Sequence, residues 1–408
     1  MLSNKQAFIK NMKILFVLHS GGAYEGSGKA FCRFLPLLIN RGVEPLVIVP
    51  TQEGGLYDIL SQSNISVVTT KYHYRFSVFP PSSTWRDRLL FLPRLFGRWM
   101  VNTYSLIQLL YIAKHFCPDA IHTNTSVCAI GYQVSRLLHI KHIWHIREYG
   151  ALDFNYYYYY PSRQWQWHRY RQNNSFTLCI TKDIQRYNQL ENDATSRVVY
   201  DGVLSQNTII YKPQKQPHLL FVGCLSEGKG VLRLLEAYAV YKQRCPRPLP
   251  LWLAGKSYSE LFMNRMDDFV KAHNLSKDLC FLGLRQDVLQ LYSDATALIV
   301  PSLSEGFGFI TAEAMFSGCL VVGHDVAGTK EQFDNGIELT GEEIALRYTQ
   351  QEQLVQHLLD ITDAVEKGVF KEHYEPMILR AQRVVKQLYT SERNAEQIFQ
   401  FYQDILGN

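Results

Sequence analysis

A repeated pattern along the chain constrains its fold more than any other feature. Residues 13–18 form a short apolar run, four glycines follow at positions 21, 22, 26 and 28, and residues 29–40 then alternate with a helical period. Short apolar strands separated by helices are typical of parallel sheets, because the crossover connection between two parallel strands is usually a helix. The pattern therefore predicts an α/β fold.

The same pattern occurs in two series. The first series predicts further strands at residues 45–49, 65–69, 120–123, 142–146 and 176–180. The second predicts strands at residues 218–222, 249–254, 279–282, 297–300 and 319–323. Residues 211–217 contain two prolines among polar residues and are typical of a linker. We therefore expect two Rossmann-like domains, 1–205 and 206–385, whose parallel sheets face a central cleft at the carboxyl ends of their strands.

Residues 386–408 are expected to contain a C-terminal helix. Ser391 is a suitable N-cap, and an apolar stripe follows it at helical spacing. The stripe consists of Ala395, Ile398, Phe399, Tyr402 and Ile405. No sequence rule assigns this stripe to a domain; we expect the helix to pack back toward the N-terminal domain.

Composition excludes several classes of protein. Of the 408 residues, 47% are hydrophobic and 19% charged, and the net charge of +5 is too small and too dispersed to indicate nucleic-acid binding. Such a charge suits an anionic substrate or an anionic membrane face. None of the eight cysteines forms a Cys-x-x-Cys pair, which favours buried free thiols and argues against zinc.

The apolar runs are too short for targeting or membrane insertion. The first run lacks the length of a secretory signal, and the nearest approach to a membrane span, residues 99–113, contains Asn102 and Gln108. We expect a cytoplasmic protein, with peripheral contact at the inner face of the membrane left open.

A glycine-rich loop with two glutamates carries the strongest chemical signal. It runs from Glu305 through Gly306, Phe307 and Gly308 to Glu313, directly after the predicted strand 297–300. The glycines let the backbone approach a ligand, and the amides at the start of the next helix favour a diphosphate. Glu313 could accept hydrogen bonds from a ribose diol, or could simply be a solvated helix residue.

This segment resembles a known family. Two glutamates separated by seven residues, with Gly-Phe-Gly after the first, are similar to the motif of retaining glycosyltransferase family 4, of the polysaccharide-assembly type. Residues 313–315, 317–319 and 327–331 resemble the elements that follow the motif in that family. The resemblance implies the two-domain GT-B fold, with Gly306, Phe307, Gly308 and Glu313 binding the donor and Glu305 supporting the transferred sugar.

The loop after the strand 218–222 also resembles the family. Gly223 and Cys224 would lie against the donor, and Lys229 would neutralise the leaving diphosphate. Cys224 stands where the family usually has arginine, so that phosphate contact is missing or is supplied elsewhere.

The first glycine-rich loop allows several interpretations. By resemblance, Gly26 and Ser27 would approach the donor, and Lys29 would lie on the acceptor side. A P-loop would need four residues before the final Gly-Lys, and a dinucleotide fingerprint would need glycine where Phe31 stands. A plain tight turn remains open.

Polar residues end two strands of the first series. His145 would bind a hydroxyl of the donor sugar, as in the similar element of polysaccharide-assembly members. Arg147 and Glu148 could form an ion pair that shapes the acceptor side, or a purely structural pair. Asn124, with His122, is a further candidate for lining the cleft on the acceptor side.

Two aromatic segments have no assigned role. Residues 71–114 combine aromatic residues with arginines, which suits contact with a membrane surface or a lipid acceptor, or ordinary amphipathic packing. The tyrosine run 156–160 could stack on sugars or pack locally.

These features together predict a metal-independent enzyme without a cofactor. It would move a sugar from a UDP or GDP sugar to a saccharide or lipid-linked acceptor with retained configuration, in cell-surface polysaccharide synthesis. Glu305, Lys229 and His145 would be catalytic. The alternatives are a nucleotide-sugar epimerase or phosphorylase, which would need no acceptor, and a scaffold or sugar-binding subunit, which Cys224 keeps open.

Overall fold

The computed structural model describes residues 11–73, 77–78, 84–150, 157–158, 163–208, 210–212 and 214–407. The chain divides into two compact units. Unit 1 consists of two segments, the chain up to Gly202 and the C-terminal segment Ser391–Asn408. Unit 2 is the segment between them, Val203–Thr390.

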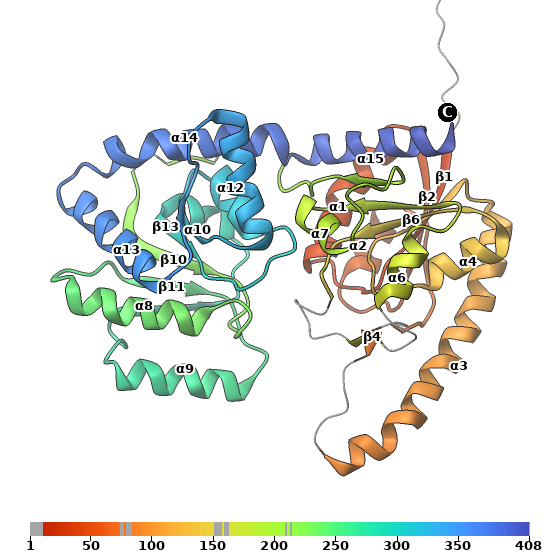
Figure 1. The fold of residues 1–408 in the computed structure, drawn as a ribbon, viewed down its shortest axis with the longest axis horizontal. Helices are drawn as coiled ribbons and strands as arrows, with labels where there is room; N and C mark the ends of the chain where they lie inside the picture. Colours follow the sequence, from red (N-terminus) through yellow and green to blue (C-terminus); the bar gives the residue numbers. More distant parts are fainter. Residues whose placement is uncertain are drawn as a thin grey trace, which may run out of the picture. The chain divides into compact units, whose positions relative to one another are not determined.

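Unit 1 is built on a parallel sheet of seven strands in the order β3-β2-β1-β5-β6-β8-β9 (Figure 1). The strands are β1 (Met12–Val17), β2 (Val43–Val49), β3 (Val67–Thr69), β5 (Ala120–Thr123), β6 (Lys141–Ile146), β8 (Ser175–Cys179) and β9 (Ser196–Val198). The strand order reverses between β1 and β5, and this is the point of an open parallel sheet where a ligand usually binds. A separate antiparallel pair joins β4 (Ser77–Val78) and β7 (Tyr157–Tyr158).

Helices connect and cover the sheet of unit 1. They are α1 (Gly26–Ile39), α2 (Leu56–Gln62), α3 (Trp85–Phe116), α4 (Ile130–Leu138), α6 (Arg163–Tyr170), α7 (Lys182–Tyr187) and α15 (Ser391–Leu406). Helix α1 begins at Gly26, three positions before the expected start at Lys29, because the backbone amide of Lys29 already donates to the Glu25 carbonyl.

The C-terminal helix α15 completes the core of unit 1. Ala395, Ile398 and Tyr402 of the predicted stripe are buried in the same cluster as Phe16 and Phe31. Phe401 is buried there as well, whereas Phe399 and Ile405 are only partly buried. Helix α15 therefore packs mainly on α1, and its apolar face is part of the hydrophobic core.

Unit 2 is built on a parallel sheet of six strands in the order β12-β11-β10-β13-β14-β15. The strands are β10 (Gln216–Val222), β11 (Leu251–Ala254), β12 (Leu279–Gly283), β13 (Ala295–Val300), β14 (Leu320–His324) and β15 (Leu346–Tyr348). The helices are α8 (Val231–Arg244), α9 (Glu260–Ala272), α10 (Val288–Asp294), α11 (Phe309–Phe316), α12 (Ala327–Thr340), α13 (Gln351–Glu366) and α14 (Phe370–Leu388). The order reverses between β10 and β13.

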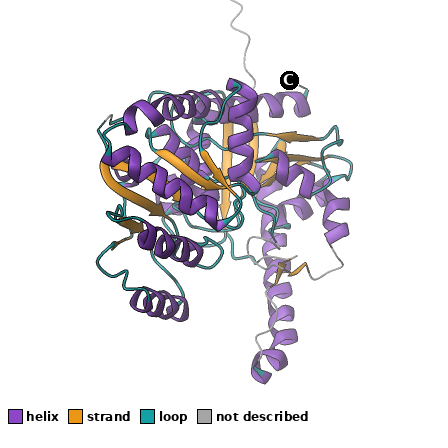
Figure 2. Cartoon of the chain, turned by 60° about the vertical axis from the view of Figure 1, so that its left-hand side comes forward, coloured by secondary structure: helices purple, strands orange, loops and turns teal. Residues whose placement is uncertain are grey.

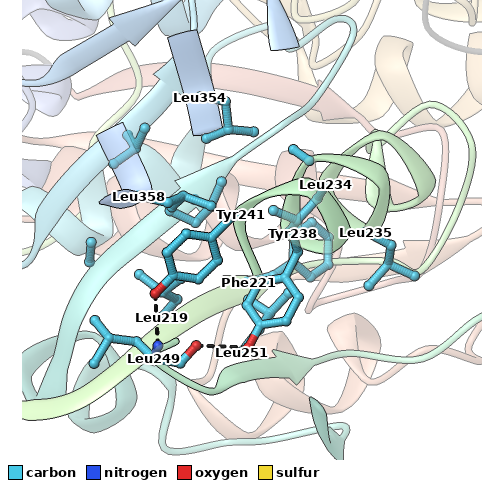
Figure 3. Close-up of a cluster of buried hydrophobic side chains, with 14 of the residues drawn as sticks. Leu219, Phe221, Leu234, Leu235, Tyr238, Tyr241, Leu249, Leu251, Leu354 and Leu358 are labelled. Atoms are coloured by element: carbon cyan, nitrogen blue, oxygen red, sulfur yellow. Dashed lines mark hydrogen bonds between the residues drawn. The ribbon is translucent and has the colours of Figure 1, made fainter. Parts of the chain in front are cut away.

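Two tyrosines of α8 join the core of unit 2 to its sheet (Figure 3). The Tyr238 hydroxyl donates to the Leu249 carbonyl at 2.8 Å, and the Leu249 amide donates to the Tyr241 hydroxyl at 2.7 Å. Both rings lie among buried leucines, so apolar burial and satisfied polar groups stabilise the same contact.

The structure shows two Rossmann-like parallel-sheet domains with a C-terminal helix, as the sequence predicted. Every predicted strand is present, although β9, β15 and the pair β4–β7 were not predicted. None of the eight cysteines forms a disulfide, but the prediction that they are buried holds fully only for Cys128, Cys179 and Cys319, and Cys117 and Cys280 are exposed. Among the helices that the structure describes, none combines the length and the apolar composition that a bilayer crossing requires.

Candidate functional site

The loops after β10 and β13 meet at the topological switch point of unit 2. The Leu303 amide donates to the Gly228 carbonyl at 3.0 Å, which joins the two loops directly. Gly230 has a φ of +70°, and a Cβ at this position would lie 1.9 Å from the Pro301 carbonyl oxygen. Only glycine permits this approach.

An ion pair lies at the junction of the two loops. The Lys229 ammonium donates to Glu305 Oε1 at 2.7 Å, and the Ser302 hydroxyl donates to the same oxygen at 2.7 Å. The Lys229 side chain is 34% exposed and that of Glu305 is 11% exposed. The structure therefore brings together two of the predicted catalytic residues, and Ser302 is a contact that the sequence did not suggest.

Helix α12 donates hydrogen bonds to the loop 305–308, which contains Glu305. The Gly328 amide donates to the Glu305 carbonyl at 2.9 Å, and the Gln332 amide group donates to the Phe307 and Gly308 carbonyls at 2.6 and 3.0 Å. These hydrogen bonds order the backbone of the loop before α11 begins.

Helix α11 starts at the predicted residue, Phe309, and Gly308 caps it with a φ of +89°. Its first amides are those that an anion could approach. Glu313 lies in the second turn and is only 2% exposed, and its charge contributes to a raised pKa of the buried Tyr292 hydroxyl, for which burial is the larger cause. Phe307 is buried and packs edge-on against Tyr389.

Gly223 and Cys224 follow β10 directly. Gly223 has a φ of +148°, and a Cβ on the neighbouring Gly255 would lie 1.8 Å from its carbonyl oxygen. Cys224 is half-buried in the same loop. The loop is therefore tightly packed where the resemblance places the donor. Lys229 is the positively charged residue of this loop.

In unit 1, the first turn of α1 lies beside the end of β5. Gly26 and Ser27 belong to this turn, so they are part of a helix and not of the predicted loop. The Asn124 side chain, buried after β5, donates to the Ser27 carbonyl at 3.3 Å. Lys29 is half-buried in the second turn. These residues therefore surround the switch point of this sheet.

Arg147 and Glu148 do not form the expected ion pair. Arg147 pairs with Asp201, with nitrogen–oxygen distances of 2.5 and 2.6 Å, and donates to Asn124 Oδ1 at 2.9 Å. Glu148 instead accepts from the Thr125 hydroxyl and from the amide and hydroxyl of Ser126 at 2.7–2.8 Å. The carboxylate that pairs with Arg147 comes from the segment after β9, whereas the partners of Glu148 come from the segment after β5, which separates the two side chains.

His145 is completely buried within a chain of polar side chains. Arg147 Nη2 can only donate, so the His145 Nδ1 atom, 3.3 Å away, is the acceptor. The His122 Nε2 atom then donates to the same Nδ1 at 3.1 Å, and the Tyr402 hydroxyl donates to His122 Nδ1 at 2.6 Å. These contacts assign the proton of His145 to Nε2, which has no hydrogen-bond partner in the structure.

The two imidazoles are neutral. Burial holds the pKa of His122 and of His145 well below the usual value, and the positive charge of Arg147 lowers both further. Neutral rings can hold the fixed pattern of one donor and one acceptor that the chain of contacts requires.

Three other residues of unit 1 were not predicted as part of the site. Asp201 accepts hydrogen bonds from Arg147, which lies 54 positions earlier in the sequence. Tyr402 contacts His122, which lies 280 positions earlier. His19 follows β1, and burial lowers its pKa while the nearby Glu148 and Glu25 oppose the shift. Only His19 had a sequence signal, since it directly follows an apolar strand.

The tyrosine run 156–160 lies largely outside the described residues, apart from the backbone of β7. Within the described part of the chain, no group of three or more His, Cys, Asp and Glu side chains is arranged to hold a metal ion.

Parts of the chain are similar in sequence to known glycosyltransferases. Residues 206–367 match the family model "Glycosyl transferases group 1". An uncharacterized glycosyltransferase of Methanocaldococcus jannaschii is 31% identical over 163 residues, which is 39% of this chain and 42% of the relative. The serotype-specific mannosyltransferase WbdA of Escherichia coli is 28% identical over 116 residues, 28% of this chain and 14% of the relative. The matches thus span less than half of these relatives.

Solved structures resemble the whole chain. HepE of Anabaena, solved with UDP, has a TM-score of 0.75 at 18% identity and covers 96% of this chain and 100% of its own. WaaG, a glycosyltransferase involved in lipopolysaccharide biosynthesis, has a TM-score of 0.63 at 14% identity and covers 97% and 100%. At these identities the likeness shows the fold, which is GT-B.

Proposed function

We propose that the chain transfers a sugar from a nucleotide-diphosphate sugar to a saccharide or lipid-linked acceptor, with retained configuration. One observation carries the proposal: the Lys229–Glu305 pair lies beside the amino-terminal end of α11, at the switch point of unit 2. An ammonium group, a helix amino terminus and a carboxylate are the charges that a leaving diphosphate and a developing sugar cation require.

In the proposed reaction, the bond between the anomeric carbon and the diphosphate oxygen breaks as the acceptor oxygen bonds to that carbon. Negative charge builds on the diphosphate, where Lys229 and the first amides of α11 would stabilise it. The departing phosphate oxygen would take the acceptor's proton, so no separate base is needed. Glu305 would stabilise the positive charge that develops on the sugar.

Lys229 has to change partners in this mechanism. Its ammonium now contacts Glu305, and a bound diphosphate would compete for it. Glu305 keeps the hydrogen bond from Ser302 when Lys229 leaves, so its carboxylate stays oriented. We propose no metal, because Lys229 and α11 would supply the positive charge that a divalent ion supplies elsewhere.

UDP is favoured over GDP as the nucleotide. Support comes from HepE, which was solved with UDP and with UDP-glucose. The donor would contact Glu313, Gly306, Phe307, Gly308, Gly223 and Cys224. His145 would offer its Nε2 proton to a hydroxyl of the donor sugar once the residues that now bury this atom move aside. Arg147, Glu148, Lys29 and Asn124 would shape the acceptor side. Involvement in cell-surface polysaccharide synthesis is supported by the likeness to WaaG, which is involved in lipopolysaccharide biosynthesis.

Calorimetric titration with UDP, GDP, ADP and their sugars, with and without EDTA, tests the proposal. We expect saturable binding of one nucleotide that EDTA does not change. Lys229→Ala and Glu313→Ala should each weaken it by about tenfold or more, since each removes a charge-assisted contact. Glu236→Ala, on the exposed side of α8, is the matched control and should leave binding unchanged.

The product distinguishes the remaining alternatives. NMR of the new glycosidic bond should show the anomeric configuration of the donor, and an inverted product would contradict retention. Turnover of the sugar without an acceptor would favour the epimerase. If no nucleotide binds, we would attribute this to Cys224, which stands where the family usually has a phosphate-binding arginine. A scaffold subunit would then be the better interpretation.

A further inference from the structure

The amino-terminal half of α3 is an unusually exposed helix. Between Trp85 and Met100, no described side chain is buried, and the buried residues of α3 begin at Asn102. Figures 1 and 2 both show this half extending away from the sheet of unit 1. Tertiary packing therefore does not cover it, although a helix of this composition usually buries one face.

One face of this helix is a continuous apolar stripe. Large side chains recur every three or four residues, and each is between 54% and 71% exposed. They are Trp85, Leu89, Leu92, Phe96, Trp99, Met100, Tyr104, Ile107 and Tyr111. Proteins that stay monomeric in water seldom expose so many large apolar side chains side by side, which indicates that something covers the stripe.

The charges of the same segment indicate what covers it. Residues 85–100 contain Arg86, Arg88, Arg94 and Arg98 but only one acidic residue, Asp87. Arginine side chains can lay their aliphatic stems along an apolar surface while the guanidinium groups meet phosphates. Tryptophan, present at both ends of this stretch, favours the boundary between an apolar phase and water.

We propose that α3 between Trp85 and Tyr111 lies along the surface of an anionic lipid bilayer. The apolar stripe enters the acyl boundary, and the arginines contact the headgroups. A second copy of the chain is a poorer partner, because a two-fold pairing of this helix would bring its arginines together. The surface deepens the proposed function by placing the enzyme where a lipid-linked acceptor resides, yet its test does not need the transfer reaction.

Sedimentation of the full chain with vesicles tests the surface directly. Vesicles of phosphatidylcholine alone are compared with vesicles that also contain phosphatidylglycerol. We expect binding to the anionic vesicles, and at least about tenfold weaker binding for the triple variant Leu89→Ser, Leu92→Ser, Phe96→Ser. The double variant Arg86→Gln, Arg88→Gln should weaken binding by about tenfold or more and reduce its dependence on salt.

Matched controls come from unit 2. Tyr258→Ser with Leu261→Ser removes exposed apolar side chains near and on α9, and Arg247→Gln with Lys367→Gln removes exposed charges. These variants should bind vesicles like the parent chain. All variants should keep the parent's nucleotide binding, which separates a failure of this surface from a failure of the proposed reaction.

Two outcomes would overturn the proposal. One is equal vesicle binding by the parent chain and the α3 triple variant. The other is a parent chain that ignores anionic vesicles and dimerises in lipid-free solution, while the triple variant is a monomer by light scattering. The stripe would then be an interface between two copies.

Discussion

Contacts with single residues determine which ring nitrogen carries the proton in each of the buried histidines His122 and His145. Tyr402→Phe should remove the donor to His122 Nδ1 and leave that nitrogen buried without a partner. We expect the free energy of unfolding to fall by about 1–3 kcal/mol. We also expect His122 to lose its single Nε2-protonated form, because its Nδ1 atom then has no donor, whereas Arg147 keeps the proton of His145 on Nε2. Chemical denaturation measures the first effect, and nitrogen NMR of labelled histidine measures the second.

Tyr24→Phe is the control, since Tyr24 is 87% exposed. It should change neither stability nor the histidine spectrum. A Tyr402→Phe chain with parental stability and an unchanged His122 signal would show that the hydroxyl does not fix the proton of His122.

The sequence offered the candidate residues of this site one at a time, but not the contacts between them. Glu305, Lys229 and Glu313 could be selected as candidates from local motifs, because each motif lies within one loop or helix. The pairing of Arg147 with Asp201 could not be predicted, because the two residues lie at the ends of different strands and no pattern in sequence connects them. The expected pair with Glu148 was wrong for the same reason.

At the scale of elements, the junction of the loops after β10 and β13 depends on one glycine. Gly230→Ala would place a methyl group 1.9 Å from the Pro301 carbonyl oxygen in a left-handed backbone conformation. We expect unit 2 to lose at least about 2 kcal/mol of stability, and the affinity for nucleotide to fall, because the loop must move away from Glu305. Calorimetry of unfolding and of nucleotide binding measures both.

Gly228→Ala provides a control within the same loop. A Cβ at Gly228 meets nothing within 4 Å, so this variant should behave like the parent chain. If both variants lose the same stability, the close approach to Pro301 is not the cause, because the stiffer unfolded chain that alanine produces would by itself stabilise the fold.

Elements with a strong period were predictable, and two of the short edge strands were not. The central strands appear as apolar runs because both of their faces are buried. Strands β9 and β15, each of three residues at a sheet edge, lack such runs. Helix α3 escaped recognition as one helix of 32 residues, because its exposed apolar stripe and Pro93 obscure the usual alternation.

At the scale of the whole molecule, the two units should differ in their sensitivity to acid. Burial lowers the pKa of His142 in unit 1 to about 3 and that of His218 in unit 2 to about 4. His122 and His145, whose pKa values are also well below 6.5, belong to unit 1. The folded chain therefore keeps more neutral histidines in unit 1 than in unit 2.

Each of these histidines binds a proton below pH 6.5 in the unfolded chain but not in the folded unit. Stability is therefore present above pH 6.5 and falls as the pH decreases toward the folded pKa. At pH 5, His142 and His218 should each lower the free energy of unfolding by about 2 kcal/mol. His122 and His145 lower it as well. Asp201 acts in the opposite direction, because burial raises the pKa of its carboxyl, but it is a single group with Arg147 opposing the shift.

We therefore expect unit 1 to unfold before unit 2 when the pH is lowered from 7.5 to 5. Calorimetry should show one transition moving to lower temperature more than the other, and hydrogen exchange identifies which unit opens first. His142→Gln should reduce the acid shift of unit 1, whereas His115→Gln, at an exposed site on α3, should not. If unit 2 proves the more acid-sensitive, or if both transitions shift equally, the buried histidines are not what limits the stability of unit 1 in acid.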